Sequence, residues 1–230
     1  MTVVITNDDG VDAPGLAALV AAARPHGRVV VVAPGEDQSN VSHRVTTGRS
    51  LAITRLGPDR YSVDGTPGDC VRLALHVLAT DATWVLSGIN EGGNLGADIV
   101  HSGTVAAARE AVLHGRRSMA FSHYRRSGQA IDWAQAERWV EALIPVLMQE
   151  AQGAHQLWNV NLPHRLAAAG TDAQPRAVRC PADTSPLPLA YRDAPAYRYS
   201  GDYHQRHRQP GMDIATCFAG DIAISSIGLW

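Results

Sequence analysis

Two adjacent carboxylates near the start of the chain are its first candidates for chemistry. Asp8 and Asp9 follow a short run of β-branched residues that begins at Val3, and they precede Gly10. Neighbouring carboxylates repel each other, and a hard divalent cation such as Mg²⁺ or Mn²⁺ relieves that repulsion. Asp and Gly are also common turn formers, so a plain Asp-Asp-Gly turn is the competing interpretation.

A second polar loop, residues 35–42, follows a continuous apolar run and contains Ser39, Asn40 and Ser42. Hydroxyl and amide oxygens are neutral ligands for a hard cation. His43 comes directly afterwards and is a candidate proton donor to a leaving group. A loop histidine is more often a solvated side chain, and that simpler role stands beside the catalytic one.

A third loop, residues 87–96, is rich in glycine and carries Asn90 and Asn94. Its glycines permit left-handed turns and close backbone approach, while its asparagines supply neutral oxygen ligands or amide donors. Because Asn and Gly dominate turns in any case, a turn-rich connection is the alternative interpretation of this loop.

The fourth feature is Ser102-Gly103-Thr104, which opens an alanine-rich helix expected over about residues 105–113. Free backbone N–H groups and the helix dipole at such a start favour a bound phosphate. Taken by itself, the tripeptide is better explained by ordinary N-capping from Ser102.

Strand-like and helix-like segments alternate over the first two thirds of the chain and must position these loops. The expected strands are residues 3–7, 28–33, 83–89 and 118–122, with a strand pair at 51–53 and 61–63; the expected helices start near Pro14, Pro67 and Val105, with a long one over 129–152. Strands joined by helices predict a mostly parallel, doubly wound α/β sheet. Open sheets of this kind bind ligands at the carboxyl ends of their strands, so all four polar loops should converge there. Hard oxygen ligands beside an anion-binding helix start describe metal-assisted phosphoryl chemistry.

Composition limits the classes of function. The 230 residues are 45% hydrophobic, with a net charge of −2 and a pI near 6.5. That balance predicts neither a nucleic-acid duplex nor a membrane as partner. Three cysteines without metal-type spacing, and no signal peptide or spanning segment, predict a cytoplasmic protein. No Gly-x-Gly-x-x-Gly follows the first strand, and no P-loop lysine motif is present.

The last third of the chain changes character and becomes rich in Pro, Arg, Tyr and Asp. We expect residues 1–165 to form the catalytic core and residues 166–230 to add an arm and a final strand over 221–227, within the same globular unit and with subunit contacts. Four arginines, Arg192, Arg198, Arg206 and Arg208, are expected on a solvated arm; contact with substrate anions across a subunit is the alternative.

Several ordered motifs together resemble the SurE family of survival protein E nucleotidases. The motifs are Thr6-Asn7-Asp8-Asp9-Gly10, Ala13-Pro14-Gly15, Val63-Asp64-Gly65-Thr66-Pro67, Ser87-Gly88-Ile89-Asn90 and Ser102-Gly103-Thr104-Val105. The resemblance runs from Met1 to about Pro163. It implies a Rossmann-like core, a homodimer or homotetramer built with C-terminal hairpins, and metal-dependent hydrolysis of nucleoside 5′- and 3′-monophosphates.

The resemblance also implies one divalent ion per subunit, Mg²⁺ or Mn²⁺, bound by Asp8, Asp9, Ser39 and Asn90. The family pattern, and not spacing, selects Asn90 over Asn94 and Ser39 over Ser42. On that basis we expect in-line attack by a metal-activated water, with Asp8 or Asp9 taking its proton. The side chains of Asn94 and Ser102 and the amides near Gly103 and Thr104 would hold the phosphate oxygens. A covalent aspartyl-phosphate is the minor alternative.

Three departures from the family pattern bear on substrate choice. Asp12 stands where the family usually has His, and Gln38 and Asn40 flank Ser39 in place of a basic residue and a glycine. The alternative functions are hydrolysis of another small phosphoester or a short polyphosphate, a non-catalytic nucleotide-binding module, and a structural oligomer.

Overall fold

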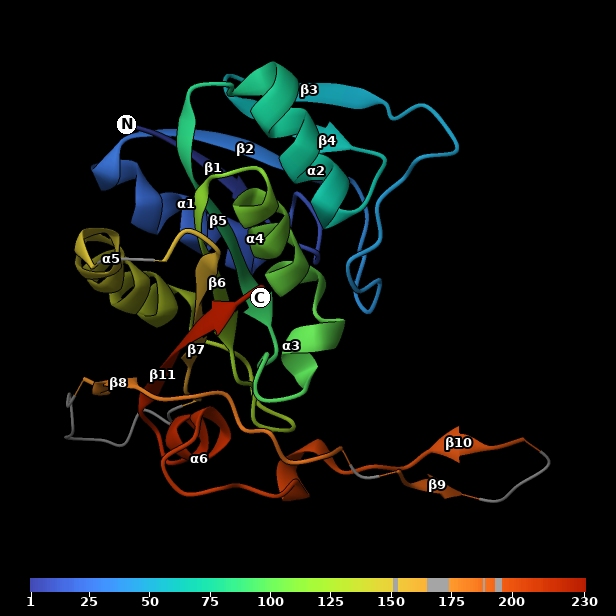
Figure 1. Ribbon diagram of the computed structural model, residues 1–230, viewed down its shortest axis with the longest axis vertical. Helices are drawn as coiled ribbons and strands as arrows, with labels where there is room; N and C mark the ends of the chain where they lie inside the picture. The colour runs from blue at the N-terminus through green and yellow to red at the C-terminus, as the bar shows by residue number, and fades with distance from the viewer. Residues whose placement is uncertain (151–152, 165–173, 188, 193–195) are drawn as a thin grey trace.

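The computed structural model describes residues 1–150, 153–164, 174–187, 189–192 and 196–230, and within these a nine-stranded sheet runs through the molecule (Figure 1). Its strands, in spatial order, are β3 (Ile53–Gly57), β4 (Arg60–Val63), β2 (Arg28–Pro34), β1 (Thr2–Thr6), β5 (Ala82–Glu91), β6 (Arg117–His123), β7 (Gln156–Leu162), β11 (Ile222–Gly228) and β8 (Ala177–Arg179). The six strands from β4 to β7 are parallel, whereas β3 is antiparallel to β4 and β11 is antiparallel to β7. The predicted α/β class, a mostly parallel Rossmann-like sheet, is confirmed.

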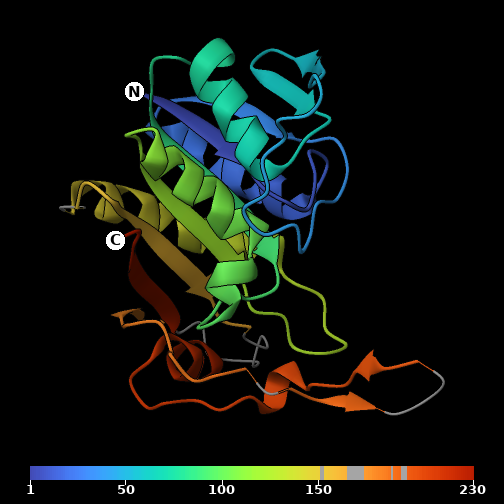
Figure 2. The same ribbon diagram turned by 45° about the vertical axis from the view of Figure 1, so that its right-hand side comes forward.

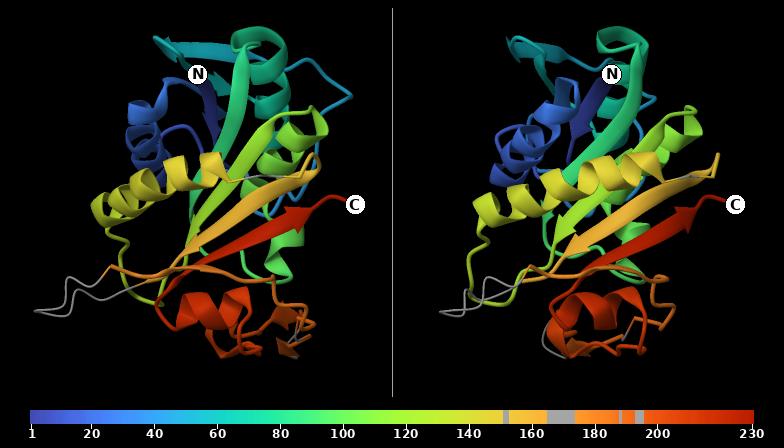
Figure 3. Two further views of the ribbon diagram at one scale, coloured as in Figure 1. Left: turned by 60° about the vertical axis from the view of Figure 1, so that its left-hand side comes forward. Right: turned by 90° about the vertical axis from the view of Figure 1, so that its left-hand side faces the viewer.

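Helices cover both faces of this sheet (Figure 3). One face carries α1 (Pro14–Ala23), continued by the short η1 (Arg24–His26), and α5 (Trp133–Gln149); the other carries α2 (Pro67–Leu73), the π-helical turn η2 (Ala74–Leu78), α3 (Asp98–His101) and α4 (Gly103–Leu113). Alternate residues of β1 pack into the hydrophobic cores on opposite faces of the sheet. Val3 and Ile5 pack with α1 and α5, and Val4 packs with α2 and α4. The three central residues of the strand are therefore all apolar, as a strand buried on both faces requires.

Local signals in the sequence set where these helices begin. Pro14 occupies the first position of α1, and Thr66 forms a capping box with Asp69 at the start of α2. The hydroxyl of Ser102 accepts a hydrogen bond of 3.0 Å from the backbone N–H of Val105 at the start of α4. These are the positions at which Pro, Thr and Ser favour a helix start.

Two predicted segments differ from the structure. The long helix was expected from residue 129, but it begins at Trp133, because the Asp132 side chain accepts a hydrogen bond from the N–H of Gln135 and caps it there. Val146, expected on its buried side, is 49% exposed, and Ile144 is buried in its place. The first strand of the predicted pair, expected over residues 51–53, runs over residues 53–57.

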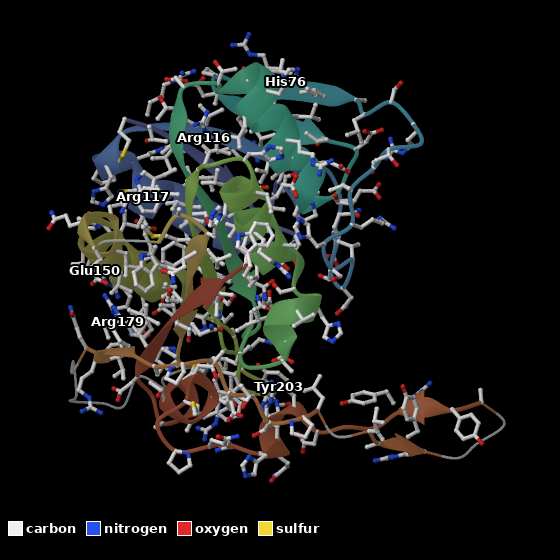
Figure 4. All side chains as sticks on the ribbon, in the orientation of Figure 1. His76, Arg116, Arg117, Glu150, Arg179 and Tyr203 are labelled. Atoms are coloured by element: carbon white, nitrogen blue, oxygen red, sulfur yellow. The ribbon has the colours of Figure 1, made fainter. Side chains whose placement is uncertain are left out.

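The C-terminal third contributes β8 and β11 to the sheet, and between these two strands the chain leaves it. After β8 the chain forms the arm of β9 (Tyr191–Arg192) and β10 (Arg198–Tyr199), which projects from the body at the lower right of Figure 2, and then η3 (Tyr203–Gln205) and α6 (Asp213–Phe218). Figure 4 shows Arg179 of β8 beside Glu150, the ion-pair partner that follows α5. The predicted division at residue 165 remains a prediction, and that residue lies outside the described part of the chain. No described helix combines the length and the apolar character that crossing a bilayer requires.

Candidate active site

A hollow of about 440 Å³ opens at the carboxyl ends of β1 and β5. Its lining consists of Asp8, Asp9, Ser39, Asn40, Asn90, Glu91, Gly93, Asn94, Asp98, His101 and Ser102. The four side chains that the family pattern assigns to a metal ion therefore share one pocket, although they come from three separate segments of the chain. Two of the four residues expected to hold phosphate line the same pocket.

Asp8 is the most enclosed of these groups, at 5% exposure. The hydroxyl of Thr104 donates to its Oδ1, and a Cβ added to Gly103 would lie 2.8 Å from its Oδ2. Gly103 and Thr104 thus stand behind Asp8, outside the pocket lining. The first turn of α4 fits closely against the carboxylate, which is a role that sequence reasoning missed because it assigned both residues to phosphate.

Burial raises the pKa of Asp8, and hydrogen bonds from Thr104 only partly oppose that effect. Burial and, next, the charge of Asp8 raise the pKa of Asp9 to about 7. The Oδ2 of Asp9 accepts one hydrogen bond of 3.2 Å from the backbone N–H of Glu91. Two carboxylates in such surroundings resist joint ionisation, and a bound cation is the usual way to keep both charged.

The neutral donors fit a cation as well. The Nδ2 of Asn90 donates to the carbonyl of Gly92 at 2.8 Å, which leaves the amide oxygen for a ligand. The Ser39 hydroxyl donates to Asp37 at 2.6 Å, so its lone pairs are not used in that contact. Among the described residues, no three His, Cys, Asp or Glu side chains cluster as a metal site. An ion in this pocket would therefore need the neutral oxygens as well as the two aspartates, a donor set suited to Mg²⁺ or Mn²⁺.

Asn94 is anchored from the neighbouring strands. Its backbone N–H donates to Asn161 at 2.8 Å, its side-chain amide donates to Ser122 at 2.7 Å, and its carbonyl accepts from Asn159 and Asn161 at 2.9 and 3.0 Å. Asn159 and Asn161 are fully buried in β7. The sequence signal for these hydrogen bonds was the pair of asparagines, two positions apart among apolar residues of the strand.

Two side chains that the sequence analysis singled out lie outside the pocket. His43 is absent from the pocket lining, and its Nε2 lies 2.7 Å from the Oε2 of the buried Glu110. It is therefore neither a solvated histidine nor a group that faces the pocket. Asp12, the departure in the first loop, is 85% exposed at its side chain and pairs with Arg60 at 2.7 Å.

Two residues of the pocket were not predicted. His101 and Asp98 belong to α3 and enter the lining with Ser102. Asp98 forms an ion pair with Arg206, which is 8% exposed, so the expectation of a solvated arginine at this position is wrong. Close by, the hydroxyl of Tyr203 (labelled in Figure 4) donates to the carbonyl of Gly93 at 3.2 Å. The segment 203–206 thus braces the glycine-rich loop from outside.

Comparisons with known proteins agree with this architecture. The family model described as survival protein SurE matches residues 3–180. A relative from Nostoc sp. with a provisional 5′-nucleotidase name is 44% identical over 228 residues and covers 99% of each chain. The 5′-nucleotidase SurE of Paramagnetospirillum magneticum is 36% identical over 99% of this chain and 89% of its own. The crystal structure of a SurE protein from Aquifex aeolicus matches with a TM-score of 0.86 and 31% identity, over 100% of this chain and 94% of the other. The chain therefore belongs to the survival protein SurE family.

Proposed function

We propose that this chain is a metal-dependent phosphatase that hydrolyses nucleoside 5′- and 3′-monophosphates to nucleoside and phosphate. The observation that carries the proposal is the shared pocket of Asp8, Asp9, Ser39 and Asn90, whose lining also includes Asn94 and Ser102. The 5′-nucleotidase names of the SurE relatives support the substrate class.

A divalent ion held by Asp8, Asp9, Ser39 and Asn90 would neutralise phosphate charge and make a nearby water more acidic. Asp9 is the better proton acceptor of the two aspartates, because Oδ1 of Asp8 is bound by Thr104 while Asp9 is less enclosed. Asp9 would take the proton of the attacking water as the water oxygen bonds to phosphorus and the bond from phosphorus to the leaving oxygen breaks, and the leaving nucleoside oxygen would take up a proton from solvent.

The phosphate is expected to lie between the aspartates and the wall formed by Asn94 and Ser102. Asn94 is held rigidly by its hydrogen bonds to β6 and β7, so it can position a phosphate oxygen without rearranging. The backbone N–H groups at the start of α4, behind Asp8, add the positive end of a helix dipole. Fixed hydrogen-bond donors of this kind lower the activation barrier of hydrolysis, because they are already oriented toward the negative charge that develops on the phosphate oxygens.

We also propose a homodimer or homotetramer in the cytoplasm, joined through the arm of β9 and β10. Exposed aromatic side chains on the arm support such a contact, since Tyr191 and Tyr199 are 59% and 54% exposed and Tyr197 is 78% exposed. The three cysteines are free and buried, which suits a reducing compartment.

The proposal is tested by phosphate release from a panel of nucleoside 5′- and 3′-monophosphates with Mg²⁺, Mn²⁺ or EDTA, using wild type and Asp8→Asn. We expect metal-dependent release that the substitution abolishes. Phosphate release only from other small phosphoesters or short polyphosphate would show that the substrates are these compounds and not nucleoside monophosphates. Nucleotide binding without turnover under every metal would indicate a binding module.

A further inference from the structure

The loop that carries Ser39 has an unusual backbone. It joins β2 to β3, and two of its residues, Asn40 and Ser42, have left-handed conformations with φ of 62° and 55°. Side chains other than glycine adopt that region at a cost, and they stay there only when the surroundings hold them. Because Ser39 and Asn40 both line the pocket, whatever holds the loop also shapes the site.

The buried carboxylate of Glu110 restrains this loop. Glu110 lies in α4 and its side chain is 1% exposed. Its Oε2 faces Nε2 of His43 at 2.7 Å, while its Oε1 accepts from Arg72 and lies 2.9 Å from Nε2 of His114. Burial alone would raise the pKa of Glu110, but hydrogen bonds from His43, Arg72 and His114 lower it to about 2. The carboxylate is therefore charged, and the facing nitrogen of His43 must carry the hydrogen.

The other fastenings of this loop are local, neutral or at its ends. Ser39 itself bonds within the loop, where its N–H and its hydroxyl donate to the exposed Asp37 at 2.8 and 2.6 Å. The hydroxyl of Ser42 donates to the carbonyl of Val100 at 3.2 Å, at the exposed side of the loop. At the two ends, the N–H of Gln38 donates to the carbonyl of Asp8, and the carbonyl of Arg44 accepts from Thr66. Among the described contacts between these ends, the bond from His43 joins the loop to a buried charge, and charge-assisted bonds are the stronger kind.

We propose that His43 is a positioning residue for the metal pocket: through Glu110 it fixes the left-handed turn that presents Ser39. This inference rests on the proposed metal site of Asp8, Asp9, Ser39 and Asn90. Without the bond, Asn40 and Ser42 can relax to right-handed conformations, and Ser39 then moves away from the two aspartates. Groups that orient metal ligands are worth about 10- to 100-fold in metal affinity when removed.

The chain offers a matched control for this proposal. His114 bonds to the same carboxylate through its other oxygen, but it directly follows α4, four residues after Glu110, and has no place in the loop. His43→Ala and His114→Ala therefore remove comparable bonds from Glu110, and only the first releases Ser39. His43→Gln keeps an N–H donor that can reach Glu110 and should restore the wild-type behaviour.

The test is isothermal titration of Mn²⁺ into each full-length variant, with phosphate release as a second readout. We expect His43→Ala to raise the Kd for Mn²⁺ by at least 10-fold, and His43→Gln and His114→Ala to stay within 3-fold of wild type. At saturating Mn²⁺, the kcat of His43→Ala should recover to within about 3-fold of wild type, since His43 acts only through the position of Ser39. His43→Asn, too short to reach Glu110, provides the same test should His43→Ala fold poorly.

Equal weakening in His43→Ala and His114→Ala would overturn the proposal, because Glu110 would then act only as a packing group. Unchanged Mn²⁺ affinity in His43→Ala would overturn it as well. A low kcat in His43→Ala that persists at saturating Mn²⁺ would also overturn the proposal, because a role limited to the position of Ser39 predicts recovery of kcat. Wild type that neither binds Mn²⁺ nor shows metal-dependent release would instead overturn the proposed function and, with it, this inference.

Discussion

The close fit between α4 and Asp8 makes Gly103→Ala the sharpest single test of the site. The added methyl carbon would lie 2.8 Å from Oδ2 and 2.9 Å from Cβ of Asp8. Non-bonded carbon contacts are comfortable at about 3.5 to 4.0 Å. Asp8 must therefore retreat by roughly 0.5 to 1 Å, although it is 5% exposed and bound by Thr104.

The magnitude follows from that displacement. Overpacking of a filled site costs about 1 to 3 kcal/mol, while replacing glycine by alanine in a helix returns up to about 1 kcal/mol. We expect Gly103→Ala to lower the free energy of unfolding by about 1 to 2 kcal/mol. Misplacing a reacting group by about 1 Å costs roughly 100-fold in rate, so kcat/KM should fall by that order while the fold persists.

The assay compares kcat/KM for phosphate release and urea unfolding in wild type, Gly103→Ala and Gly48→Ala. Gly48 is the control because a Cβ at this exposed position meets nothing within 4 Å. The control should keep wild-type activity and stability. A Gly103→Ala enzyme with kcat/KM within 2-fold of wild type would refute the reasoning that the first turn of α4 sets the position of Asp8.

Three further predictions concern charge. Because burial and Asp8 raise the pKa of Asp9 from 3.8 to about 7 in the folded chain, the metal-free protein should lose stability as the pH rises between these two values. The loss is complete at pH 8, so Asp9→Asn should raise the melting temperature there in EDTA and abolish the gain that Mn²⁺ gives wild type. Burial lowers the pKa of His123 from 6.5 to about 4, so the unfolded chain binds the proton at a higher pH than the folded chain does. The free energy of unfolding should therefore fall by about 3 kcal/mol as the pH drops from 6.5 to 4. His123→Gln should flatten that dependence in urea titrations. Arg206→Met leaves Asp98 unpaired and should cost about 2 kcal/mol in thermal unfolding, whereas the exposed Arg198→Met should cost under about 0.5.

Much of the scaffold is readable from the sequence because its signals are local. The β-branched run before Asp8, the proline at position 14 and the cap at Ser102 each act within a few residues, and each lies where it was predicted. The parallel sheet follows from the alternation of strands and helices. Its carboxyl edge then brings Asp8 near Asn90, although the chain separates them widely.

What sequence reasoning missed depends on contacts between distant segments. Gly103 has the appearance of a phosphate-loop glycine, yet its lack of a side chain accommodates Asp8. Arg206 sits among arginines typical of a solvated arm, yet it is buried against Asp98. His43 has the sequence context of a solvated loop histidine, yet its Nε2 faces the buried carboxylate of Glu110 in α4. In each case the residue type is uninformative, because the partner is set by tertiary packing.

The order of strands at the far edge of the sheet has a consequence for how that edge is held. β11 inserts between β7 and β8, and in the described structure β8 has sheet pairing only with β11. β8 can therefore join the sheet only when β11 is in place. Removal of residues 222–230 would deprive the sheet of two strands instead of one, so the truncated chain should be far more sensitive to protease at Arg176 and Arg179 than the 230-residue chain.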